Sequence, residues 1–302
     1  MNNSNIEKIL HILRCPATGS RLSIDVDALV SEGDQRIRYP IINGIIDFVG
    51  SRSDYDQHWN EFSELPTSST KLAQAKDFID WINCSAGDLK DVDIILDVGC
   101  GDGNHLPFFP VNSTVIALDY SDSVYVVKKR YSNMENLIVL RADAMHLPVA
   151  DKSVGLIVSY SCFNHLPEPK LGMLEVMRVL KEDAYAAIWG YGTNSSFIFY
   201  GFRAAKLVAK VFRRVGMESI LIYALIPLLR WLPSATRIRP GRNSMKECKE
   251  IISTNLAPEY VHILFKWTWD DLKVDGLKLV SNYKQQCGQL FRKADSGEIN
   301  VQ

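Results

Sequence analysis

The stretch that decides the fold is Leu96-Asp97-Val98-Gly99-Cys100-Gly101-Asp102-Gly103, which continues an apolar run that starts at Ile94. An apolar run that ends in closely spaced glycines predicts a buried strand and a tight turn, where a ligand can approach the backbone because no Cβ intervenes. In a doubly wound sheet this turn lies at the carboxyl edge, where ligands bind. A dinucleotide-binding turn would have glycine at position 104, where this chain has Asn104. The Asp97 carboxylate suits a ligand with an ammonium group better than a pyrophosphate.

Short apolar runs alternate with helical stretches on both sides of this turn. Such alternation predicts an α/β fold with a mostly parallel sheet and helices on both faces. The runs are Ile94–Val98, Thr114–Leu118, Leu137–Leu140, Leu156–Ser159 and Ala184–Trp189. The helices are expected within residues 121–131 and 168–181, where Ser121 is typical of an N-cap and Lys128, Lys129 and Arg130 suit a helix C-terminus. Residues 257–302 predict a helix near Asp270–Val274 and strands near Leu277–Val280 and Gln289–Phe291.

Acidic residues stand at the ends of the next two predicted strands. Asp119 ends the run VIALD, where a carboxylate can accept hydrogen bonds from both hydroxyls of a ribose. Asp143 follows the third strand and can accept from an adenine amino group, with the N–H of Ala144 facing the ring. The loop SYSCFNHL then follows the fourth strand.

The order LDVGCGDG, ALDYS, ADAMHLP and SYSCFNHL resembles the class I S-adenosylmethionine-dependent methyltransferases, in particular the ubiquinone-biosynthesis-like group, over about residues 90–192. The resemblance implies a Rossmann-like, doubly wound, seven-stranded sheet with S-adenosyl-L-methionine as the cofactor. It implies that Asp97 and the glycine turn hold the methionine part, Asp119 the ribose and Asp143 the adenine, and that Ser159–Tyr160 line the sulfonium. The cofactor-binding residues predicted in this way are Asp97, Gly99, Cys100, Gly101, Gly103, Asp119, Tyr120, Ser121, Asp143, Ala144, Ser159 and Tyr160.

Two positions depart from the family pattern. Gly155 stands where the family usually has an acidic residue, and Glu182-Asp183-Ala184 stands where a Pro-Gly-Gly turn is common. The segment 256–280 also resembles the end of a subset of these enzymes, or it is simply the last αβ unit of the sheet. The residues that carry this second resemblance are Pro258, Tyr260, His262, Trp269, Asp271 and Gly276.

The first 50 residues predict a small β-rich module. CPATGSRL followed by YPIINGIIDF resembles a zinc-ribbon-like domain that acts as a methyltransferase activator. Zinc versions need two C-x-x-C pairs, but here Cys15 is followed by Thr18, so we expect no metal. The apolar residues expected to hold the module are Leu13, Leu22, Ile24, Tyr39, Ile41, Ile45 and Phe48. The alternative is a cap with no regulatory role. Residues 51–93 predict a helical cap before the catalytic domain, 94–302.

The formal net charge of −1 conceals a local asymmetry. Residues 193–256 hold 11 Lys or Arg against three acidic residues, and the rest of the chain holds 23 basic against 32 acidic residues. Within this insertion, 202–215 is amphipathic at helical spacing, which predicts a basic helical lid. Such a lid favours an anionic or amphiphilic acceptor, such as a sugar, lipid-linked or natural-product intermediate, and leaves peripheral membrane contact open. A solvated basic face is the alternative. Nucleic acid is disfavoured, because the aromatic residues there resemble core rather than stacking platforms.

The cysteine pattern and the apolar runs bear on the compartment. The six cysteines form no C-x-x-C pair, which suits a reducing cytosol. The N-terminal stretch lacks the pattern of a signal peptide, and the longest apolar run, 220–229, contains Pro227 and is shorter than the roughly 20 residues of a membrane span. We therefore expect a soluble, cytoplasmic protein with no transmembrane segment.

The expected reaction is an in-line methyl transfer to an unidentified small molecule, in which the protein mainly aligns the reactants. His165 is the first candidate for a base, followed by Tyr160, His262 and His58, and each has a structural role as its alternative. Tyr55 and Trp59 can close over the cofactor or simply pack. Three other functions stay open: a non-catalytic methyltransferase-like binding protein, an NAD-dependent oxidoreductase, which Asp97 and Asn104 disfavour, and an RNA methyltransferase.

Overall fold

The computed structural model describes residues 4–50, 69–87, 89–190, 272–283 and 288–294. The chain divides into two compact units, 1–192 with 269–302 and 193–268. The predicted lid and its amphipathic helix lie in the second unit, outside the described residues. Eight other residues singled out from the sequence also lie outside them, namely Tyr55, His58, Trp59, Pro258, Tyr260, His262, Trp269 and Asp271.

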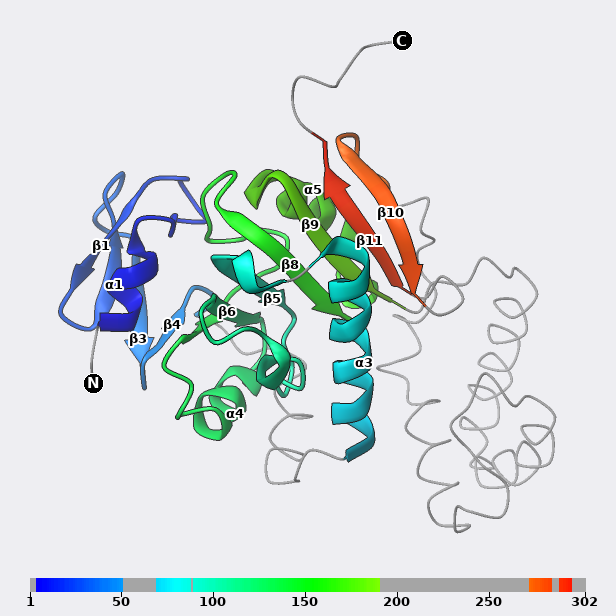
Figure 1. Cartoon of the computed structure of the whole chain (residues 1–302). Helices are drawn as coiled ribbons and strands as arrows, with labels where there is room; N and C mark the ends of the chain where they lie inside the picture. Colours follow the sequence, from blue (N-terminus) through cyan, green and yellow to red (C-terminus); the bar gives the residue numbers. More distant parts are fainter. Residues whose placement is uncertain (1–3, 51–68, 88, 191–271, 284–287, 295–302) are drawn as a thin grey trace, which may run out of the picture. The chain divides into compact units, whose positions relative to one another are not determined.

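An eleven-stranded mixed sheet runs through the first unit, in the order β1-β2-β3-β4-β7-β6-β5-β8-β9-β11-β10 (Figure 1). Its centre is parallel and consists of β7 (Leu137–Arg141), β6 (Thr114–Asp119), β5 (Ile94–Val98), β8 (Val154–Tyr160) and β9 (Leu180–Trp189). These strands lie at the five predicted apolar runs. Beyond β9, the antiparallel strands β11 (Gly288–Lys293) and β10 (Leu277–Tyr283) follow.

The N-terminal residues extend the other edge of the same sheet. Short β4 (Ile45–Asp47) pairs in parallel with β7, and the antiparallel strands that follow outward are β3 (Arg38–Ile42), β2 (Ala28–Ser31) and β1 (Leu22–Asp25). The sheet as a whole has eleven strands and not seven, because β1 to β4 of the N-terminal residues extend the seven strands β5 to β11. Without β4, strand β7 would be an edge strand with a row of unpaired N–H and C=O groups, and β4 pairs with this row.

Helices cover both faces of the sheet. The side chains of α3 (Ser69–Ala86) and α4 (Ser123–Arg130) share one buried cluster with Ile95. Those of α1 (Ser4–Leu10) and α5 (Pro169–Val179) share another with Leu96. Ile95 and Leu96 reach different clusters because successive residues of a strand point to opposite faces. Three short 3₁₀ turns complete the elements: η1 (Leu89–Asp91), η2 (Leu106–Phe108) and η3 (Phe163–His165).

Two local predictions are wrong. Helix α4 begins at Ser123 with Asp122 at its N-cap, and the Ser121 hydroxyl instead donates to Asp119 Oδ1 at 2.7 Å. The predicted helix near 270–274 is absent from the described part of that stretch, because residues 272–274 are not helical. The cations Lys128–Arg130 do lie in the last turn of α4, as predicted.

The N-terminal module shares the core of the first unit. All seven apolar residues predicted to hold it are buried or partly buried against the two clusters. The Cys15 thiol lies 3.2 Å from the Tyr39 hydroxyl, inside the module. Across the described residues, no three His, Cys, Asp or Glu side chains gather as a metal-binding group. The absence of zinc stays a prediction. None of the described helices has the length and apolar character needed to cross a bilayer.

Both departures from the family pattern lie at the amino ends of strands. A Cβ at Gly155 would lie 3.0 Å from Val92 and 3.1 Å from the Asp93 carboxylate, so an acidic side chain there would require these neighbours to shift and would face a like charge. Glu182 forms ion pairs with Lys152 (2.6 Å) and Lys293 (3.7 Å). Because the glycine turn follows the carboxyl end of β5, these departures lie away from it.

Candidate functional site

The glycine turn after β5 has a left-handed backbone and packs tightly against other parts of the chain. The φ angles of Gly99, Gly101 and Gly103 are 72°, 52° and 76°. These angles lie in the left-handed region, which residues with a Cβ rarely adopt. A Cβ at Gly99 would lie 2.6 Å from the Sγ of Cys162, and closer still to its Cβ. The loop after β8 therefore packs directly on the turn, and only glycine fits at position 99.

Asp97, the residue before Val98 at the end of β5, carries a buried and unused carboxylate. The residue is 0% exposed, and neither carboxylate oxygen has a hydrogen-bond partner. Burial, with a smaller contribution from the negative charge of Asp119, raises the pKa of Asp97 to about 8. A buried polar group without partners is costly, so this carboxylate marks a place that a donor or a cation from a ligand can fill.

Asp119, at the end of β6, joins the glycine turn to the turn that precedes α4. Its Oδ2 accepts from the N–H of Gly101 at 3.0 Å. Its Oδ1 accepts from the N–H and the hydroxyl of Ser121, at 2.9 and 2.7 Å. A carboxylate has about four acceptor positions, so Asp119 keeps capacity for further donors.

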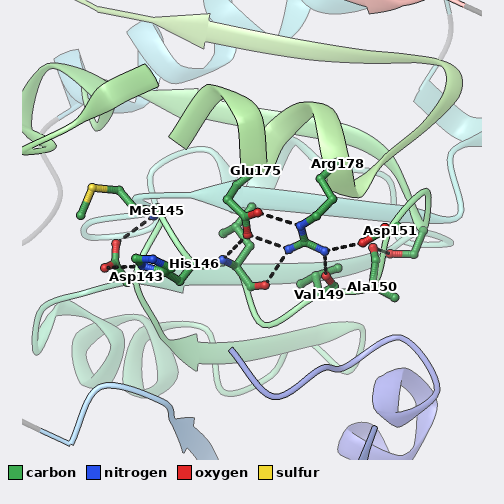
Figure 2. Close-up of polar contacts among 10 residues, drawn as sticks. Asp143, Met145, His146, Val149, Ala150, Asp151, Glu175 and Arg178 are labelled. Carbon is green, nitrogen blue, oxygen red and sulfur yellow. Dashed lines mark hydrogen bonds and ion pairs between the residues drawn. The ribbon is translucent and has the colours of Figure 1, made fainter. Parts of the chain in front are cut away.

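Asp143 and Ala144 follow β7 at the same edge of the sheet. Asp143 Oδ1 accepts from the N–H of Met145 at 2.8 Å, and Ala144 is buried. Figure 2 shows this turn beside Glu175 and Arg178 of α5, which hold residues 147–151. Arg178 donates to the carbonyl oxygens of Leu147 (3.0 Å) and Val149 (2.7 Å), and Glu175 accepts from the N–H of Leu147 (2.8 Å). The segment after Asp143 is thereby fixed by α5.

The end of β8 supplies two of the predicted residues. The buried Ser159 hydroxyl donates to the carbonyl of Val98 at 2.8 Å, so it binds β5 to β8. The Tyr160 ring stacks on Trp189 of β9, with centroids 4.2 Å apart and planes 2° apart. Phe78 of α3 meets Tyr160 edge-on at 5.3 Å. Tyr160 is thus held rigidly at the carboxyl edge.

His165 lies in η3, in the loop after β8. Burial lowers the pKa of its imidazole to about 4. The ring is therefore neutral at pH 7 and able to accept a proton or a hydrogen bond, although a group with so low a pKa is a weak base.

His105 lies beside these residues and was not among the candidates from the sequence. It follows the glycine turn by two residues, is buried, and its Nε2 has no hydrogen-bond partner. Its ring centroid lies 5.1 Å from that of Tyr160 and 5.9 Å from that of Phe78. The one signal in the sequence is that His105 directly follows Asn104, the position at which the chain departs from the dinucleotide pattern.

The sequence of this site matches a known family. Residues 96–188 match the model of the methyltransferase domain family, and this stretch contains the glycine turn, Asp119, Asp143 and Tyr160. A "Probable S-adenosylmethionine-dependent methyltransferase" of Mycobacterium tuberculosis is 33% identical over 89 residues, which are 29% of this chain and 31% of the relative.

Other relatives have similar identities to this chain. An uncharacterized methyltransferase of Schizosaccharomyces pombe is 29% identical over 120 residues, which are 38% of this chain and 46% of the relative. The demethylmenaquinone methyltransferase of Staphylococcus aureus is 27% identical, over 51% of this chain and 65% of the relative. The first of these relatives is thus matched over about half of its length. A solved S-adenosylmethionine-dependent methyltransferase from Aquifex aeolicus is 23% identical, over 47% of this chain and 76% of that chain, with a TM-score of 0.39.

Proposed function

We propose that the chain is an S-adenosylmethionine-dependent methyltransferase that acts on a small-molecule acceptor. The observation that carries the proposal is the Asp97 carboxylate, buried without a partner beside the glycine turn of a methyltransferase domain. The residues present fit this cofactor, whose methionine end carries an ammonium group that can satisfy a buried carboxylate. A pyrophosphate would instead place negative charge beside Asp97.

Each cofactor residue has a proposed role that agrees with its surroundings. Asp97 binds the ammonium group, and the turn formed by Gly99, Cys100, Gly101 and Gly103 holds the methionine part. Asp119 accepts from the ribose hydroxyls with the positions that Gly101 and Ser121 leave open. Asp143 and Ala144 face the adenine, and Tyr120 flanks it. Ser159 and Tyr160 line the sulfonium, Ser159 as part of the wall, since its hydroxyl is bonded to Val98.

The protein's part in the reaction is mostly alignment. When bound, S-adenosylmethionine supplies an electrophilic methyl group. The stacked pair Tyr160–Trp189 forms a rigid wall against which an acceptor can be oriented for in-line attack. His165 and Tyr160 are the proposed catalytic residues. His165 is neutral above about pH 4, so it can accept a hydrogen bond or a proton from an acceptor that must lose one.

The proposed class of acceptor molecule is inferred from the charged residues of the insertion. The excess of 11 basic over three acidic residues in 193–256 favours an anionic or amphiphilic molecule, such as a sugar, lipid-linked or natural-product intermediate. The similarity to a demethylmenaquinone methyltransferase adds amphiphilic quinone precursors to the acceptors worth testing. We also propose that the protein acts in the cytoplasm.

Calorimetric titration tests the cofactor, and a transfer assay tests the activity. We expect the full chain to bind S-adenosylmethionine and S-adenosylhomocysteine and to show no heat with NAD. We expect methyl-labelled S-adenosylmethionine to pass label to a small-molecule fraction of a cell extract, and not to its RNA. Binding without transfer to any fraction would instead favour a non-catalytic binding protein. Binding of NAD alone would overturn the proposal.

A further inference from the structure

The N-terminal module, residues 4–50, is bonded to the strand that leads to Asp143. Strand β4 pairs with β7, with Ile46 beside Leu140 and Asp47 beside Arg141. The N–H of Phe48 then donates to the Arg141 carbonyl at 2.8 Å. The end of the module is therefore hydrogen-bonded to Arg141, which stands two residues before Asp143 in the sequence.

The Arg141 side chain continues this connection to the end of β6. It is buried, and its Nη1 lies 3.4 Å from Asp47 Oδ2. On its other side, Nε donates to the carbonyl of Tyr120 at 3.2 Å, and Nη2 lies 3.5 Å from Asp122 Oδ1. The planar fork of a guanidinium holds several acceptors in fixed directions.

Tyr120 and Asp122 flank the residue that hydrogen-bonds to Asp119. Ser121, between them, donates to the Asp119 carboxylate through both its N–H and its hydroxyl. Direct contacts therefore run from Asp47 in the module to the carboxylate proposed for the ribose.

A second contact reaches the segment after Asp143. Leu13 forms a β-bridge with Val149, the N–H of Arg14 donates to the Pro148 carbonyl at 3.0 Å, and the N–H of Ala150 donates to the Ile12 carbonyl at 2.7 Å. This segment is thus held by the module as well as by α5 (Figure 2). The module supports both segments assigned to the adenosine half of the cofactor.

We propose that Asp47 is a positioning residue for the cofactor site, which fixes Arg141 and, through it, the turn from Tyr120 to Asp122 that orients Asp119. The inference rests on the proposed function. Breaking a buried ion pair from one side leaves the other charge uncompensated. Without Asp47, Arg141 shifts its hydrogen bonds, and the turn around Ser121 loses its fixed geometry.

The Asp47→Asn variant of the full chain tests this role with little other change. Oδ1 of Asp47 accepts from the N–H groups of Val49 and Gly50, and the Asn oxygen keeps both bonds. The charge that faces Arg141 is lost, and the amide NH2, a donor, takes the place of the oxygen that accepted from the guanidinium. The matched control is Asp25→Asn, which breaks the exposed ion pair with Arg38 in the same module. We expect the Kd for S-adenosylhomocysteine to rise about tenfold in Asp47→Asn and to stay within twofold in Asp25→Asn. The Kd values of both variants are measured well below their melting temperatures.

Two further readouts separate positioning from mere stabilisation. Hydrogen–deuterium exchange of the ligand-free protein is expected to speed up across residues 119–123 in Asp47→Asn alone. Arg141→Lys keeps a charge for Asp47 but loses the fork, so its Kd is expected to rise as well. Wild-type Kd values with unchanged exchange, even at a lower melting temperature, would overturn the proposal. If the wild-type chain bound no S-adenosylhomocysteine, the proposed function would fail, and the exchange comparison would still decide the role of Asp47.

Discussion

Replacing Asp97 by asparagine is expected to weaken the binding of S-adenosylhomocysteine about 100-fold. The substitution keeps the size of the side chain and removes the charge that the ammonium group is proposed to meet. A hydrogen bond to a charged group contributes about 1.5–3 kcal/mol, and the upper end of this range applies to a site closed to water. Calorimetry measures the change. The matched control is Asp80→Asn, which removes an exposed carboxylate paired with Lys76 on α3 and is expected to leave the Kd unchanged.

The same variant is expected to be more stable than the wild type at pH 8. In the folded chain the pKa of Asp97 is raised to about 8, against 3.8 in the unfolded chain. The folded state therefore binds more protons between these values, and the free energy of unfolding falls as pH rises from about 4 to about 8. Asparagine does not titrate, so the free energy of unfolding of Asp97→Asn should exceed that of the wild type by on the order of 5 kcal/mol at pH 8.

Denaturant unfolding of both proteins at pH 5 and pH 8 measures this difference. In the wild type, the affinity for S-adenosylhomocysteine should rise with pH up to about 8, since the ionised carboxylate is the form that binds a cation. The variant should show no such dependence from this group. Equal stability of the two proteins at pH 8, together with equal affinity, would mean that Asp97 is neither strained by burial nor in contact with the ligand.

Replacing Gly99 by alanine is expected to cost about 3–5 kcal/mol of stability and to abolish cofactor binding. The new Cβ would overlap Cys162, and the position has a φ of 72°. To relieve the overlap, the loop after β8 must move away from the glycine turn, and overpacking of this kind adds to the backbone strain. Thermal or denaturant unfolding and calorimetry give the two quantities.

Gly19→Ala is the matched control for Gly99→Ala. Gly19 has a φ of 71°, and a Cβ there meets nothing within 4 Å. It carries the backbone strain without the overlap, so its cost should be about 1 kcal/mol, with an unchanged Kd. A loss of the same size in both variants would show that the contact with Cys162 is unimportant.

The centre of the sheet was predictable because buried parallel strands are near-continuous apolar runs. All five predicted runs lie within β5 to β9. The joining of the N-terminal strands was not predictable in this way, since the pairing of Ile46 with Leu140 links residues 94 positions apart and leaves no local pattern. The prediction of Ser121 as the N-cap was wrong for a related reason. Its hydroxyl is bonded to Asp119, a choice that depends on the surrounding structure and not on cap preference.

The candidate site was likewise predictable only in part. The order of the motifs gave Asp97, Asp119 and Asp143 at neighbouring strand ends, because parallel strands bring their carboxyl ends to one edge. That Asp97 lacks a partner, while Asp119 already has three donors, follows only from the folded geometry. His105 and the pair Asp47–Arg141 were missed because a single buried polar residue has no sequence period to reveal it.

A crystal structure of the full chain with S-adenosylhomocysteine tests the central claim most directly. We expect the ammonium group within about 3 Å of the Asp97 carboxylate and the ribose hydroxyls within about 3 Å of Asp119, both ordinary hydrogen-bond distances. We also expect the adenine beside Asp143 and Ala144. A ligand bound away from the glycine turn, or one that leaves the Asp97 carboxylate without a partner, would contradict the account.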